Sequence, residues 1–165
     1  MGKQRKLTAG EIALAKAAFG AKVDYTKVEL NEGPGTRFAA HIAFAKGNPA
    51  ITLGSEVYFK HDFCDDFSQS GRNRKSFIHE MTHVWQYQKL GMAKFLLRYG
   101  EELAKAGGKA NDMYKYEAGK SKFKEAMLEA QANMIGDYSE ALWKADAARM
   151  ATLAKNLAGG GLYAL

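Results

Sequence analysis

The sequence is poor in the features that mark several common classes of protein. Its one cysteine, Cys64, excludes an internal disulfide framework. No apolar run approaches the ~18 residues that cross a membrane, and the basic residues 1–6 precede an amphipathic segment rather than the apolar stretch of a signal peptide. We therefore expect a protein without a membrane span that is soluble in the cytoplasm as synthesised. Its export would need a signal-independent route.

The sequence also lacks a dense basic segment, although its net charge is +6. The lysines are scattered without interleaved aromatic residues, and no nucleic-acid-binding module is recognisable. We therefore expect no nucleic-acid partner and a basic surface that suits acidic partners. With 165 residues, of which 47% are hydrophobic, the chain is long enough to bury a core, so we predict one domain over residues 1–165.

A zinc-binding pattern stands at the centre of the chain, where residues 79–83 read His-Glu-Met-Thr-His. The surrounding sequence predicts a helix over residues 73–90, closed by Gly91. On that helix His79 and His83 share one face and can bind a single Zn²⁺. Glu80 would lie beside the metal, where a carboxylate can take a proton from metal-bound water. This pattern predicts a zinc metallopeptidase.

Two histidines leave the predicted zinc site one protein ligand short. The other histidines, His41 and His61, both precede the motif, and the metzincin position six residues after His83 is Lys89. The gluzincin arrangement, with a carboxylate on a later helix, remains. Glu129 is the best candidate because it lies in a helix predicted over residues 122–156 and has small alanine neighbours that let two helices approach closely.

Other residues compete with Glu129 or could support it. Glu125 lies one turn earlier and is its main rival, whereas Glu101 and Glu102 sit in a lysine-rich amphipathic helix predicted over residues 93–105 and look solvated. Asn133, one turn after Glu129, could accept a hydrogen bond from a ligand histidine and fix its tautomer, or be an ordinary polar helix residue.

Several segments together resemble a known family. They are residues 7–11 (Leu-Thr-Ala-Gly-Glu), 78–86 around the zinc motif, Tyr114 and Tyr116, 128–132 around Glu129, and Asp137-Tyr138. These segments resemble the small bacterial Vgr-related or Rhs-associated zinc metallopeptidase domains, which are minimal gluzincins. The resemblance implies a zincin-like fold with Glu129 as third ligand. By association with type VI secretion, it implies a secreted effector or toxin, with secretion-system components or an immunity protein as partners.

The pattern of apolar residues predicts an α+β fold: a small, mainly antiparallel sheet packed on the motif helix and on a second helix that carries Glu129. A capping box at Thr8 and Glu11 opens a first helix that Gly20 closes. The expected strands are residues 27–30, 38–44, 50–53 and 55–59. We expect the last of these to be an edge strand to which an extended peptide substrate adds, and Gly136 to be a bend in the long C-terminal helix.

The predicted reaction is hydrolysis of a peptide bond in a peptide or protein substrate, with Glu80 assisting the attack of zinc-bound water. Tyr114, Tyr116 and His41 are the candidate donors to the oxyanion. One alternative is a zinc-dependent peptidase or amidase acting on peptidoglycan, which the basic charge favours. Another is a non-catalytic, zinc-containing adaptor of a secretion particle. Glu80 argues against the adaptor, because structural zinc does not need that carboxylate.

Overall fold

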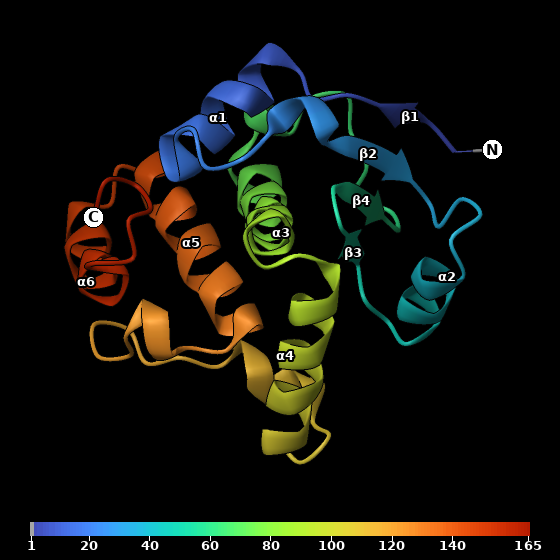
Figure 1. Ribbon diagram of the computed structural model, residues 1–165. Coiled ribbons are helices and arrows are strands. Elements are labelled where there is room, and N and C mark those ends of the chain that lie inside the picture. The colour runs from blue at the N-terminus through green and yellow to red at the C-terminus, as the bar shows by residue number, and fades with distance from the viewer. Residues whose placement is uncertain (1) are drawn as a thin grey trace.

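The computed structural model describes residues 2–165, which form an α+β fold (Figure 1). The sheet within these residues has four strands: β1 (Gln4–Arg5), β2 (Glu29–Glu32), β3 (Ala50–Leu53) and β4 (Glu56–Phe59). The six α-helices of the same residues are α1 (Ala9–Phe19), α2 (Phe38–Ala45), α3 (Gly71–Leu90), α4 (Met92–Lys105), α5 (Leu128–Trp143) and α6 (Ala147–Leu157). None of the helices described combines the length and apolar character needed to cross a bilayer.

Helix α3 runs through the centre of the molecule, between α5 on one side and the sheet on the other, with α4 below it in Figure 1. The side chain of Ser70 accepts from the backbone of Asn73 at the start of α3, and Gly91, at φ +80°, ends it. Apolar side chains of α3 lie in the main core together with side chains from α1, α5, α6, β2 and β4. The prediction of this helix is confirmed, and the helix begins two residues earlier than predicted, at Gly71.

Helix α1 begins with the predicted capping box. The Thr8 hydroxyl accepts from the backbone N–H of Glu11, and the Glu11 carboxylate accepts from the backbone N–H of Thr8. The same buried carboxylate pairs with Arg5 at 2.7 Å and accepts from the backbone N–H of Phe67 at 2.9 Å. Glu11 therefore joins α1 to β1 and to the segment that leads into α3.

The strand order β1-β2-β4-β3 places β3, not β4, at an edge of the sheet. Strand β2 pairs with β4 in parallel, while β3 pairs with the opposite side of β4 in antiparallel fashion. The prediction that residues 55–59 form an edge strand is therefore wrong, because β4 has a neighbour on each side. The strand predicted at residues 50–53 is confirmed as β3.

Residues 38–44, predicted as a strand, lie in helix α2 instead. The segment is short and apolar, so its periodicity alone does not separate a strand from a helix, and its four alanines favour the helix. Ala40 and Phe44 of α2 pack with Tyr58 of β4, and Ile51 and Leu53 of β3 pack against this cluster. Helix α2 thus covers the face of β3 and β4 that carries these side chains.

The single helix predicted over residues 122–156 is divided into a 3₁₀ turn (Phe123–Glu125) and the helices α5 and α6. Between the two helices Ala145 has φ +51°, and the Asp146 side chain accepts from the backbone of Arg149 to start α6. Gly136 lies inside α5, whereas the break between α5 and α6 falls at residues 144–146.

Glu102 is buried, contrary to the expectation that it would be solvated. Met127 precedes α5 and offers no capping side chain, so the first N–H groups of that helix need another acceptor. Glu102 supplies it by accepting from the backbone N–H of Leu128 at 2.7 Å, and Arg98 pairs with the same carboxylate at 2.7 Å. The glutamate of α4 therefore fixes the start of the helix that carries Glu129.

Candidate metal centre

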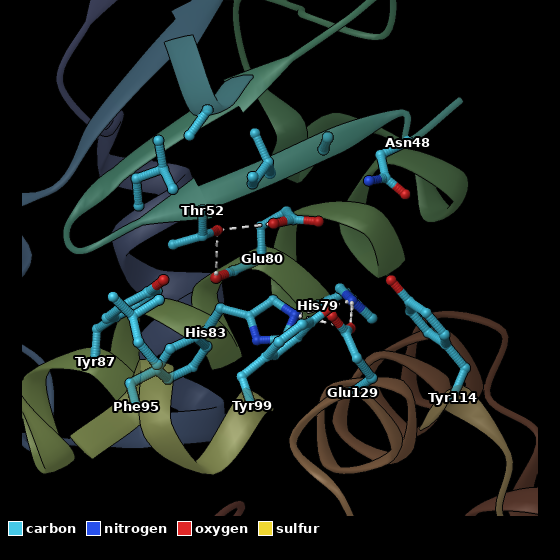
Figure 2. A pocket seen from close by; sticks show the side chains of 15 residues that line it. Asn48, Thr52, His79, Glu80, His83, Tyr87, Phe95, Tyr99, Tyr114 and Glu129 are labelled. Carbon is cyan, nitrogen blue, oxygen red and sulfur yellow. Dashed lines mark hydrogen bonds and ion pairs between the residues drawn. The ribbon is translucent and has the colours of Figure 1, made fainter. Parts of the chain in front are cut away.

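Helices α3 and α5 bring His79, His83 and Glu129 together, as the sequence predicts (Figure 2). His83 Nε2 lies 3.1 Å from Glu129 Oε2, and His79 Nε2 lies 3.3 Å from both of these atoms. All three side chains are at least 85% shielded from solvent, with exposed fractions of 15%, 8% and 7% for His79, His83 and Glu129. Within residues 2–165, this is the one group of three or more such side chains that could hold a metal ion.

His83 and Glu129 stabilise each other's charged form. Burial opposes the protonated form of His83, but the carboxylates of Glu129 and Glu80 outweigh it and raise the pKa of that imidazole to about 9. Burial likewise opposes the ionised form of Glu129, yet His83 and His79 hold the pKa of its carboxyl well below the usual range. The carboxylate of Glu129 therefore favours positive charge beside it in this buried pocket.

Gln86 fixes the orientation of His83. Its side-chain N–H₂ donates to the backbone carbonyl of Leu128 and to the Gln131 side chain, both at 3.0 Å, so its oxygen faces His83. That oxygen lies 2.8 Å from His83 Nδ1 and can only accept, which places the proton on Nδ1. His83 Nε2 is then left to face Glu129, as a metal-binding nitrogen must.

Glu80 lies beside this group, and strand β3 holds it. Thr52 of β3 donates through its hydroxyl to Glu80 Oε2 at 2.7 Å, and the same hydroxyl lies 3.3 Å from the backbone carbonyl of Glu80. Both side chains are buried and both line the same cleft. Thr52 was not found from the sequence, because a threonine in a short strand carries no local sign that it faces a carboxylate 28 residues away.

A cleft of about 300 Å³ opens over these side chains between β3, α3, α4 and the segment before α5. Its lining comprises Ala39, Asn48, Ala50, Ile51, Thr52, Leu53, His79, Glu80, His83, Tyr87, Phe95, Leu96, Tyr99, Tyr114 and Glu129. All four residues of the edge strand β3 belong to it.

The structure separates the three predicted oxyanion donors. Tyr114 lines the cleft with its ring stacked on His79 at 6.0 Å, and burial, together with Glu129, raises the pKa of its hydroxyl. Tyr116 is not among the lining residues, because its hydroxyl donates to Asp137 on α5. His41 is exposed, and its ring Nε2 donates to the Gly35 carbonyl at 3.0 Å outside the cleft.

Three further residues refine the sequence-based picture. Tyr99 of α4 lines the cleft and was missed; burial and the carboxylate of Glu129 raise its pKa to about 12. Asn133 donates to the backbone carbonyl of Tyr114 at 3.1 Å, so it positions the tyrosine segment rather than a histidine. Glu125 has a side chain that is 73% exposed and lies 3.7 Å from Lys122, away from the histidines.

Comparisons with known proteins place these residues in a wider context. Residues 7–91 match the model of the eCIS core domain. Over 134 residues, 81% of this chain, the sequence is 31% identical to the type VI secretion system spike protein VgrG2b of Pseudomonas aeruginosa, of whose length the chain spans 13%. The solved effector domain of Pseudomonas aeruginosa VgrG2b matches at a TM-score of 0.67 and 28% identity, over 94% of this chain and 82% of that one. The likeness thus extends over nearly the whole fold.

Proposed function

This chain belongs to the eCIS core domain family, and from that membership, its likeness to the VgrG2b effector domain and its donor cluster we propose that it is a type VI secretion effector domain that hydrolyses peptide bonds with zinc. His79, His83 and Glu129 would hold the ion, in a zincin-like fold of the gluzincin type. Export would follow the route of the secretion spike.

The spacing of the three donor atoms carries the metal part of this proposal. Ligands held at about 2.0–2.1 Å in a tetrahedron lie roughly 3.3–3.4 Å from one another. The Nε2 atoms of His79 and His83 and Oε2 of Glu129 stand 3.1–3.3 Å apart. Two imidazoles and one carboxylate are also a ligand set that catalytic zinc uses, leaving a fourth position open. The residues present therefore fit zinc.

Zinc, when bound, supplies a Lewis acid that lowers the pKa of water and polarises a carbonyl oxygen. Glu80 supplies the base. Thr52 donates a hydrogen bond to Glu80 Oε2. The other carboxylate oxygen of Glu80 takes a proton from the attacking water and then delivers it to the leaving amine. Tyr114, whose raised pKa keeps the hydroxyl protonated, donates a hydrogen bond to the developing oxyanion. The hydroxyl of Tyr116 bonds Asp137 of α5, so Tyr116 would anchor the segment that carries Tyr114 to α5 rather than contact the substrate.

Strand β3 supplies the binding edge for the substrate. It ends the sheet on the cleft side, and all four of its residues line the cleft. An extended peptide that adds to this edge places its backbone across Glu80, because Thr52 of the same strand bonds that carboxylate. We therefore assign to β3 the role that the sequence suggested for residues 55–59.

The test compares Glu80→Gln with wild type and with Glu125→Gln, which removes the same charge from an exposed side chain. Zinc content is measured for each protein, and cleavage of an unfolded protein is followed by mass spectrometry, with purified sacculi in parallel. We expect all three proteins to hold zinc and only Glu80→Gln to lose cleavage, by about 10²–10⁴-fold. Release of stem peptides from sacculi without cleavage of protein would mean that the substrate is peptidoglycan rather than protein. A zinc-loaded wild type that cleaves neither would favour the non-catalytic adaptor.

A further inference from the structure

The two ends of the cleft differ in chemistry on either side of the metal centre. Figure 2 shows Tyr87 and Phe95 beside His83 at one end, and Asn48 and Tyr114 at the other. Leu96 of α4 also lines the cleft, so α3 and α4 supply an apolar wall to it. The charged lining groups, Glu80, Glu129 and the two histidines, belong to the centre itself, and Tyr87, Tyr99 and Tyr114 add hydroxyl groups to the lining.

The apolar wall is already ordered. The rings of Tyr87 and Phe95 stack at 3.7 Å with an interplanar angle of 23°, and both side chains are buried. Phe95 also meets the ring of His83 edge-on at 6.2 Å, which places the wall directly beside one of the predicted metal ligands. Leu96, the next residue along α4, is 54% exposed and so keeps apolar surface available to an incoming group.

The register of β3 directs substrate side chains toward this wall. Along an extended peptide, side chains alternate between the two faces of the sheet to which it adds. Thr52 points to α3, where it bonds Glu80, whereas Ile51 and Leu53 pack on the opposite face against the cluster that includes α2. Every second side chain of an added peptide therefore projects on the α3 side of the cleft.

A charged side chain placed against the wall would lose water without gaining an ionic partner, whereas an apolar one would gain from leaving water. We infer that the cleft selects peptides carrying a large apolar side chain beside the scissile bond, on the His83 side, and that Leu96 is a specificity-determining residue. This inference rests on the proposed peptidase function and names its substrate class.

The test uses zinc-loaded enzyme and peptides that differ only at the two residues flanking the scissile bond, each varied among Leu, Phe, Ala, Asp and Lys. For wild type we expect kcat/KM with Leu or Phe at one of the two positions to exceed that with Ala by at least about tenfold. Leu96→Asp should erase this preference and raise kcat/KM for the Lys peptide at the same position, because it adds a carboxylate to the wall.

The neighbouring leucine provides a matched control. Leu97 is 65% exposed on the same helix and does not line the cleft, so Leu97→Asp adds the same charge one residue away. We expect it to keep the wild-type order of peptides.

Three results would overturn the inference, and only the last of them would also overturn the proposed function. Cleavage without an apolar preference, or equal changes in Leu96→Asp and Leu97→Asp, would remove Leu96 as a specificity residue and leave the peptidase function standing. No cleavage of any peptide by zinc-loaded wild type would remove the peptidase function and the inference with it.

Discussion

The α3–α5 side of the cleft and the helices α2 and α4 differ in how much of their side-chain surface reaches solvent. On the first side the Glu129 side chain is 7% exposed and Gln86 is 1% exposed, and each is held by hydrogen bonds. On α2 and α4, the side chains of Phe38, Leu96 and Leu97 are 78%, 54% and 65% exposed. Groups whose charge and orientation matter are fixed by buried partners, whereas groups that can meet another molecule are left accessible. Substitutions should therefore have unequal consequences on the two sides.

Removing a predicted ligand should disrupt the buried side most. We expect Glu129→Ala to reduce zinc from about one ion per chain to near zero, because two imidazoles alone leave the ion without its carboxylate. Elemental analysis of the purified variant measures this directly. Glu125→Ala, in an exposed position next to Lys122, should retain wild-type zinc. Equal zinc in both variants would remove Glu129 from the site.

Removing the partner of a ligand should have the next largest effect. Gln86→Leu takes the acceptor from His83 Nδ1 and leaves the imidazole free to turn, so zinc affinity should fall by roughly 10–100-fold. Competition with a chelator measures the change. Gln88→Leu is the control, because Gln88 lies on the same helix but bonds Asp24 and Ser55 instead. Similar losses in both variants would argue against an orienting role for Gln86.

The spacing between α3 and α5 should respond to one added methyl group. A Cβ at Gly136 would lie 3.2 Å from the Lys75 carbonyl and 3.7 Å from His79 Cβ, so Gly136→Ala should lower the free energy of unfolding by about 1–2 kcal/mol. Gly100→Ala in α4 meets nothing within 4 Å and should instead raise it by roughly 0.5–1 kcal/mol. Denaturant unfolding compares the two. If both substitutions raised the free energy of unfolding, α3 and α5 would be able to move apart and accept the added methyl group without destabilising the fold.

An exposed residue of α2 should give the smallest effect. Phe38 is 78% exposed, so Phe38→Ser should change the free energy of unfolding by less than about 0.5 kcal/mol. Thermal unfolding monitored by circular dichroism is sufficient to measure this. A loss of several kcal/mol would show that the ring is packed in solution and that the contrast between the two sides does not hold at α2.

The sequence was informative where neighbouring residues decide the structure. The spacing of His79 and His83 within one helix, the capping box at Thr8 and the stop at Gly91 are local patterns, and each is found as predicted. Glu129 was inferred from ligand chemistry, which asks for a carboxylate on a later helix, and the structure places it beside both histidines.

The sequence was uninformative where a distant partner decides the structure. Strand order depends on the pairing of β2 with β4, although α2 and β3 lie between them in the sequence. Nothing in residues 55–59 signals that pairing. Glu102 looked solvated because its neighbours are lysines, yet the uncapped start of α5 draws its carboxylate inward. Thr52 likewise gains its role only when β3 lies over α3.

The three donors come from two helices, and 46 residues separate His83 from Glu129 along the chain. The unfolded chain holds these groups far apart, so an ion that binds all three binds the native state alone. By mass action, free ion at a thousand times its Kd would shift the folding equilibrium by about 4.1 kcal/mol. That amount is a large share of the 5–15 kcal/mol by which domains of this kind are usually stable. The abundance of the folded chain would then follow the metal supply of the compartment in which it finds itself.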